Sequence, residues 1–220
     1  MINLYLIRHG QSQYNSQGLI QGQRDISLSD NGRSQVRALA KRLQLTSSID
    51  LIITSDLKRA SETAAIINEY IPSPVVSDAR WREILWGDWE GKSWPEVAHH
   101  PTFKTYLEEW YEYRGHGGES WSQTAQRVAA ALAEIEQTCE GKRVAVVTHG
   151  GLSRIALIVA LKLTPRYYPF SSDNTSITEL WLQDKVWRLK RLNDSAHLEN
   201  TGLEDDCCTG DSDATKTKRP

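Results

Sequence analysis

Two histidines that each precede a glycine are the most promising reactive groups in this sequence. Arg8-His9-Gly10 follows an apolar run near the N-terminus, and Thr148-His149-Gly150 follows another apolar run far along the chain. Neutral imidazole is a frequent nucleophile and general base, and an adjacent glycine lets the backbone approach a ligand closely. One histidine after a strand usually has a structural role. Two at equivalent places, one of them beside an arginine, indicate a shared catalytic site.

Two arginines add fixed positive charge to these histidines. Arg8 is adjacent to His9, and Arg59 lies in Ser55-Asp56-Leu57-Lys58-Arg59-Ala60, near the start of an expected helix. Taken alone, Arg59 is more typical of a helix surface. A guanidinium, however, presents a fork of donors that matches the oxygens of a phosphate, and a helix N-terminus carries partial positive charge. Two arginines and two histidines around one pocket predict a site for a dianion.

Short apolar runs must deliver these side chains to one place. Residues 2–7, 51–53 and 144–147 read as buried strands that end in polar residues. Amphipathic helical patterns occur between and after them, marked by Val36, Leu39, Ala40 and Leu43, by Ala60, Thr63, Ala64 and Ile67, and by Val128, Leu132 and Ile135. Strands that alternate with helices predict an α/β fold with a mainly parallel sheet covered on both faces. Ligands bind at the carboxyl ends of such strands.

The remaining patterns complete the expected domain. Ser120 and Gln123 have the spacing of a capping box, a helix is expected over 151–162, and alternation around 177–190 predicts two late strands at a sheet edge. Residues 80–113 are rich in Trp and Tyr and are expected to include a lid or side wall over the strand ends. From about Glu199 onward, apolar residues become rare. We therefore expect a domain over 1–198 and a disordered tail over 199–220.

Composition narrows the class of protein and its partners. The chain has 220 residues, which suits one domain, and 26 basic against 28 acidic residues leave no excess positive charge for nucleic acid. No apolar run is long enough to cross a bilayer, and the first residues lack a basic leader, so we expect a soluble, cytoplasmic protein without a membrane partner. Three cysteines make no disulfide framework, and the His99-His100 pair has no third ligand at a recognisable spacing. We expect neither a metal nor another cofactor.

These motifs together resemble the histidine phosphatase (phosphoglycerate mutase-like) superfamily. The resemblance covers about residues 2–193 and rests on five stretches in the same order as in that family: residues 6–12 with Asn15, 21–25, 55–64, 83–91 and 148–151. It implies a three-layer α/β/α sandwich around a mainly parallel sheet with an antiparallel edge strand.

The resemblance also implies residue roles. His9 would attack phosphorus and become a phosphohistidine, and Glu83 would be the acid and base, although spacing alone does not exclude Asp88 or Glu90. Arg8, Arg59 and His149 would hold the phosphoryl oxygens. The residues expected to bind substrate are Asn15, Ser12, Gln21, Gly22, Gly150 and His197.

The activity implied is that of a phosphoric monoester hydrolase of the histidine acid phosphatase type, acting without metal on a small phosphorylated metabolite. The segment around Glu83 and the loop 117–120 are similar to the phosphatase branch. Phosphoserine or a broad range of substrates is favoured, with ribazole phosphate and phosphoglycerate open. Two alternatives are phosphoryl transfer of the phosphoglycerate mutase type and a non-catalytic phosphoester-binding module. Aromatic residues within 103–113 are a candidate homodimer surface.

Overall fold

The computed structural model of the chain describes residues 1–165 and 170–203. Most of the expected tail, residues 204–220, lies outside the described residues. Residues 199–202 form turns, and the carbonyl oxygen of Leu203 accepts a hydrogen bond from Gln35 Nε2 at 3.0 Å. The domain boundary after residue 198 therefore stays a prediction.

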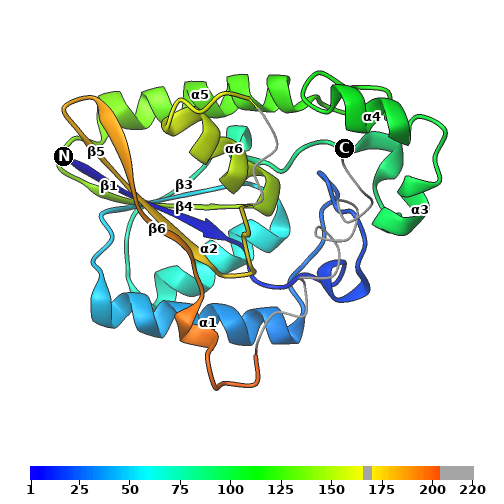
Figure 1. The fold of residues 1–220 in the computed structure, drawn as a ribbon. Coiled ribbons are helices and arrows are strands. Elements are labelled where there is room, and N and C mark those ends of the chain that lie inside the picture. The colour runs from blue at the N-terminus through cyan, green and yellow to red at the C-terminus, as the bar shows by residue number, and fades with distance from the viewer. Residues whose placement is uncertain (166–169, 204–220) are drawn as a thin grey trace.

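A six-stranded sheet in the order β3-β2-β4-β1-β5-β6 forms the centre of the fold (Figure 1). The strands are β1 (Ile2–Arg8), β2 (Leu51–Thr54), β3 (Val75–Ser77), β4 (Arg143–Thr148), β5 (Ile177–Gln183) and β6 (Val186–Asp194). β1 to β4 are parallel, while β5 pairs antiparallel with both β1 and β6. The mainly parallel sheet with an antiparallel edge is thus confirmed. β3 was not predicted, because this short edge strand is exposed along its whole length and has no buried alternation.

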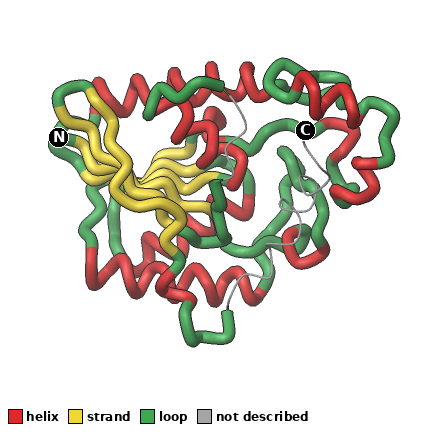
Figure 2. Tube along the Cα trace, in the orientation of Figure 1, coloured by secondary structure: helices red, strands yellow, loops and turns green. Residues whose placement is uncertain are grey.

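Helices cover both faces of the sheet, as the alternating pattern predicted (Figure 2). α1 (Asp30–Thr46) and α2 (Lys58–Tyr70) lie on one face, and α5 (Trp121–Thr138) and α6 (Gly150–Ala160) lie on the other (Figure 1). The expected capping box begins α5: Ser120 Oγ accepts from the Gln123 amide, and the Gln123 side chain accepts from the Ser120 amide. The shorter helices are α3 (Trp94–Ala98), α4 (Phe103–Glu109) and the 3-10 turns η1 (Asn15–Gln17), η2 (Ala79–Trp81), η3 (Gly87–Trp89) and η4 (Ala196–Leu198).

Strand alternation divides the core into two layers. Ile2, Leu4 and Leu6 of β1 belong to the cluster under α5 and α6, whereas Ile7 belongs to the cluster under α1 and α2. Both layers are needed because a central parallel strand is buried on each face. No helix among the described residues is long and apolar enough to cross a membrane.

The carboxyl ends of the central strands meet at one edge of the sheet. Arg8 pairs with Thr148 in the β1–β4 register, and the His9 amide donates to the Thr148 carbonyl at 2.9 Å. The next residue, His149, therefore lies level with His9. The segment with α3 and α4 extends beyond this same edge (Figure 1).

Candidate active site

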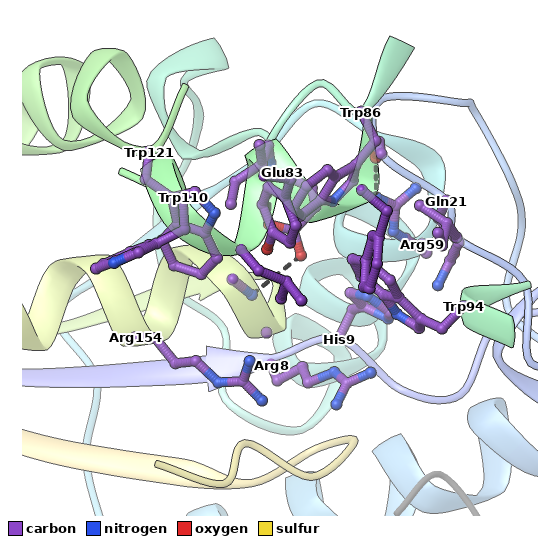
Figure 3. A pocket seen from close by; sticks show the side chains of 18 residues that line it. Arg8, His9, Gln21, Arg59, Glu83, Trp86, Trp94, Trp110, Trp121 and Arg154 are labelled. Carbon is purple, nitrogen blue, oxygen red and sulfur yellow. Dashed lines mark hydrogen bonds between the residues drawn. The ribbon is translucent and has the colours of Figure 1, made fainter. Parts of the chain in front are cut away.

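A cavity of about 170 Å³ opens at this edge (Figure 3). The expected site residues that line it are Arg8, His9, Gln21, Gly22, Arg59, Glu83 and Gly150. They come from β1, the loop after it, α2, the segment following β3 and the first turn of α6. Residues distant in sequence thus share one pocket, as expected from the edge at which parallel strands end.

The ring of His9 is fixed by its own backbone. Its side chain is 2% exposed, and Nδ1 lies 2.7 Å from the carbonyl oxygen of Gly10. Because a carbonyl oxygen only accepts, Nδ1 carries the proton and Nε2 keeps a lone pair. Burial lowers the pKa of His9 well below its ordinary value, and the charges of Arg59 and Arg8 lower it further. His9 is therefore a neutral base at physiological pH.

His149 packs against His9 at the N-terminus of α6. The ring centroids are 5.1 Å apart in an edge-on arrangement, and His149 is fully buried. Arg59 Nε donates to its Nδ1 at 3.2 Å, which makes Nε2 the protonated nitrogen facing Ser55 Oγ at 2.9 Å. Burial, followed by the charge of Arg59, holds the pKa of His149 well below its ordinary value.

Arg59 is a buried cation held mainly by carbonyl oxygens. Its Nη1 and Nη2 donate to the carbonyls of Arg24 and Gly22 at 2.8 and 2.7 Å. Burial lowers its pKa to about 10, so the guanidinium remains charged at neutral pH. Among the described residues it forms no direct ion pair with a carboxylate. Its charge interacts favourably with Glu83, Glu90 and Asp25 without contacting them, and an anion in the pocket would offset more of the cost of burying it.

Glu83 faces the pocket with a defined orientation. Its Oε1 accepts from the Ile84 amide at 2.9 Å and its Oε2 from the Gly151 amide at 3.1 Å (Figure 3). Arg127 of α5 donates to the Glu83 carbonyl at 3.0 Å, which fixes the backbone that carries this carboxyl group. Glu90, one of the rival carboxylates, accepts from the amides of Gln23 and Trp86 and is not part of the pocket lining.

Three expected substrate-binding residues occur in the loop after β1. Ser12 Oγ lies 2.7 Å from Gln21 Oε1 and 3.0 Å from Asn15 Oδ1, and the Ser12 amide donates to Asn15 Oδ1. Only Gln21 of these three lines the cavity. Ser12 and Asn15 lie behind Gln21, where they orient its amide group.

His197 lies elsewhere, which corrects the expectation that it contacts substrate. It belongs to η4, which packs on α1, and its Nε2 lies 2.9 Å from Thr175 Oγ1. It does not line the cavity. Burial lowers the pKa of His197 to about 4. Asp194 at the end of β6 pairs with Ile177, which in turn pairs with Ile7, so the hairpin returns the chain to the carboxyl end of β1. From there η4 packs on α1, outside the cavity lining.

Sequence reasoning missed Arg154 and underestimated the aromatic residues. Arg154 lies one helical turn after Gly150, so both are on the face of α6 that borders the pocket. That i, i+4 spacing was a usable signal. The expected side wall is present, and its rings line the cavity: Trp86, Trp94, Phe103, Tyr106, Trp110 and Trp121. Trp121 lies beyond the segment to which the sequence assigned this wall.

The part of the chain that the structure describes has no group of three or more His, Cys, Asp or Glu side chains placed to hold a metal ion. The polar groups of the pocket are instead guanidinium, imidazole, carboxyl and backbone amide groups. This set can bind an oxyanion, supply a nucleophile and transfer a proton.

Comparison with known proteins gives consistent relatives. The family model of the histidine phosphatase superfamily (branch 1) matches residues 4–195. The metal-independent phosphoserine phosphatase of Arabidopsis thaliana is 33% identical over 208 residues, which are 91% of this chain and 84% of that protein.

Two solved structures have the same fold. A mycobacterial glucosyl-3-phosphoglycerate phosphatase is 34% identical with a TM-score of 0.79, covering 87% of this chain and 98% of that one. A mutant phosphoserine phosphatase from Entamoeba histolytica, in complex with phosphoserine, is 30% identical with a TM-score of 0.82, covering 90% and 100%.

Proposed function

The chain belongs to branch 1 of the histidine phosphatase superfamily, and from this premise we propose that it hydrolyses small phosphomonoesters through a phosphohistidine on His9. One observation carries the proposal. The Nδ1 proton of His9 is committed to the Gly10 carbonyl, so a neutral Nε2 is available in a pocket that also contains three arginines and one carboxyl group. A pocket that only bound phosphoesters would not need this nucleophile together with an acid.

In the first step, His9 Nε2 attacks phosphorus and the bond to the ester oxygen breaks. Arg8 and Arg59 neutralise the phosphoryl oxygens, with Gln21 and the Gly150 amide as neutral donors. Glu83, protonated at this stage, transfers its proton to the departing alkoxide. His149 keeps Arg59 Nε in place and packs against the attacking ring.

In the second step, water attacks the phosphohistidine and the phosphorus–nitrogen bond breaks. The Glu83 carboxylate accepts the proton of the water, which returns it to the protonated form. Inorganic phosphate leaves and His9 is again neutral. Splitting the reaction into two displacements lowers each barrier. No metal ion is required by these steps.

The substrate range proposed for this site is a small metabolite, with phosphoserine or a broad set of monoesters as the starting expectation. The names of two relatives, phosphoserine phosphatase and glucosyl-3-phosphoglycerate phosphatase, support this range. Phosphoryl transfer of the phosphoglycerate mutase type is the second candidate, because another relative is named a probable phosphoglycerate mutase.

The decisive experiment uses the His9→Ala variant with 4-nitrophenyl phosphate in the presence of EDTA. The wild-type enzyme should release phosphate at an unchanged rate with EDTA, and the variant should lose at least a thousandfold in kcat. Acid-quenched wild type should carry acid-labile phosphate from a labelled substrate. Turnover by the variant would refute the role of His9, and isomerisation of labelled 3-phosphoglycerate without phosphate release would favour the mutase.

A further inference from the structure

The part of the pocket beyond the phosphoryl-binding groups is an aromatic wall, defined here as Trp86, Trp94, Trp110 and Trp121. These four rings contact one another in series. Trp94 meets Trp86 at 5.4 Å between centroids, Trp86 meets Trp121 at 6.5 Å, and Trp121 meets Trp110 at 5.4 Å, all edge-on. The leaving group of a bound monoester must extend from phosphorus along this wall (Figure 3).

A second layer of rings holds the wall in place. Trp89 is fully buried and stacks on Trp86 at 5.8 Å, and it also contacts Trp94 and Tyr106. Interlocked rings of this kind lose little conformational freedom when a ligand binds. The wall is therefore a preformed apolar surface.

Among residues 1–165 and 170–203, the charged side chains that line the pocket offer no uncommitted partner for a positively charged leaving group. They are three arginines and one acid, Glu83. Glu83 already accepts two backbone hydrogen bonds and is the proposed acid and base. An ammonium group, such as that of phosphoserine, would lie near three guanidiniums, whose repulsion opposes the cation–π attraction of the indole rings. Burying an ionised group without its counter-ion is strongly unfavourable.

Arg154 marks the outer part of the pocket. Its Nε donates to the Phe170 carbonyl at 2.8 Å, and in Figure 3 its guanidinium points toward Arg8. This third arginine strengthens the bias against a cationic leaving group. The lining residues thus combine apolar contact area with positive potential.

We propose that the leaving group of the preferred substrates is an apolar alcohol without positive charge, such as a single aromatic ring or a short alkyl chain. This inference rests on the proposed function and narrows it. The cavity measures about 170 Å³, and this volume includes the space that the phosphoryl group takes beside His9, so only a small leaving group fits. A zwitterionic amino-acid phosphate fits the same space but leaves its ammonium unpaired.

The test compares benzyl phosphate with O-phospho-L-serine, both of which are esters of primary alcohols. Benzyl phosphate should be hydrolysed with a kcat/KM at least tenfold higher, since one extra methylene in an apolar pocket already gives roughly 10–200-fold. Equal values, or a higher kcat/KM for phosphoserine, would overturn the inference while leaving the phosphatase assignment intact.

Two variants probe the wall directly. Trp110→Leu should lower the ratio of kcat/KM for benzyl phosphate to that for methyl phosphate by about tenfold. Trp181→Leu is the matched control, because Trp181 is also a partly exposed tryptophan but lies on β5, away from the pocket. An unchanged ratio in a folded Trp110→Leu protein would contradict the wall as the specificity surface.

Leu107→Asp should shift the substrate preference in the opposite direction, toward phosphoserine. Leu107 lines the pocket and is 40% exposed, so a carboxylate there is compatible with folding. The new carboxylate supplies the missing partner for an ammonium group. The ratio of kcat/KM for phosphoserine to that for benzyl phosphate should therefore rise at least fivefold. A folded variant whose ratio stays the same would contradict the charge argument.

A binding measurement separates this inference from the proposed function. Calorimetry on the wild-type chain should give tighter binding for benzylphosphonate than for 2-amino-4-phosphonobutyrate. Tighter binding without hydrolysis of any monoester would sustain the apolar subsite and defeat the phosphatase mechanism. Tighter binding of the aminophosphonate would defeat the subsite.

Discussion

At the scale of single residues, burial sets the protonation states that the chemistry needs. His9 and His149 are buried beside Arg59, and burial together with that charge lowers the pKa of both imidazoles. The same burial lowers the pKa of Arg59 only to about 10, which leaves it cationic. The site therefore has neutral bases next to a permanent cation, an arrangement that suits attack on a bound dianion.

The first residue-scale prediction concerns the titration of the two histidines. Because their lowered pKa values favour the neutral rings, the ¹H–¹⁵N NMR signals of His9 and His149 should not titrate between pH 8 and 6. Protonation should occur only well below 6.5, the ordinary value. A midpoint at or above 6.5 for His9 would contradict the effect of burial and of the two arginines.

The second residue-scale prediction concerns proton donation by Glu83. Glu83→Gln should lower kcat for an alkyl phosphate by roughly 100–10,000-fold, because the departing alkoxide needs a proton. Formation of the phosphoenzyme from 4-nitrophenyl phosphate should suffer much less, since nitrophenolate leaves unprotonated. Stopped-flow measurement of the nitrophenol burst tests this difference. Glu90→Gln is the control, and an equal loss for both leaving groups would count against acid catalysis.

At the scale of elements, α5 connects the pocket to the rest of the domain. Arg127 donates to the carbonyls of Glu83 and Arg80 and forms an ion pair with Glu119 at 3.0 Å. Its side chain is mostly buried. Arg127 thereby helps to fix the segment after β3, together with Gln23, whose Nε2 donates to the same Glu83 carbonyl at 3.0 Å.

We expect Arg127→Met to lower kcat by about 10–100-fold with a smaller change in KM. Displacing a catalytic group by about 1 Å costs on the order of a hundredfold, while the phosphate-binding arginines stay in place. Steady-state kinetics with benzyl phosphate measure this split. Arg143→Met is the matched control, because Arg143 pairs with Asp50 at the opposite end of β4. A rise in KM alone would indicate a substrate-binding role instead.

At the scale of the whole molecule, the segment after the β5–β6 hairpin closes over α1. His197 in η4 is largely buried, and its Nδ1 has no hydrogen-bond partner among the described residues. Burial and the nearby Arg42 lower its pKa to about 4. This contact couples the stability of the domain to pH, and Thr175, which contacts His197, also donates its amide to the carbonyl oxygens of Arg8 and His9.

The stability prediction follows from that low pKa. Between pH 6.5 and about 4 the unfolded chain binds a proton at His197 and the folded chain does not. The stability that His197 contributes is complete above pH 6.5 and decreases as the pH falls through this window. Allowing for partial exposure, the loss is about 2 kcal/mol.

Urea denaturation of the wild type and of His197→Gln tests this. Above pH 7, the free energy of unfolding should depend on pH in the same way in both proteins. The wild type should lose stability faster between pH 6.5 and 4.5, because glutamine takes up no proton. Parallel pH profiles would contradict the burial of a neutral His197.

The sequence alone determined five of the six strands, the helical layers and the reactive groups at the strand ends. Apolar periodicity and strand–helix alternation are local properties, and the edge at which parallel strands end follows from them. His9, Arg59 and Glu83 were identified in this way or by resemblance. Their roles in catalysis remain the proposal that the variants test.

Only the tertiary structure decided which side chains enclose the leaving group. Trp121 and Arg154 lie far from Trp86 in the sequence. The i, i+4 spacing places Arg154 on the same helix face as Gly150, but no local pattern brings that face, Trp121 and Trp86 to one cavity. The same holds for His197, because the position of η4 on α1 depends on where β6 ends in the sheet. Such contacts arise from packing between distant segments, and the free energy of that packing is not encoded in any single stretch of the chain.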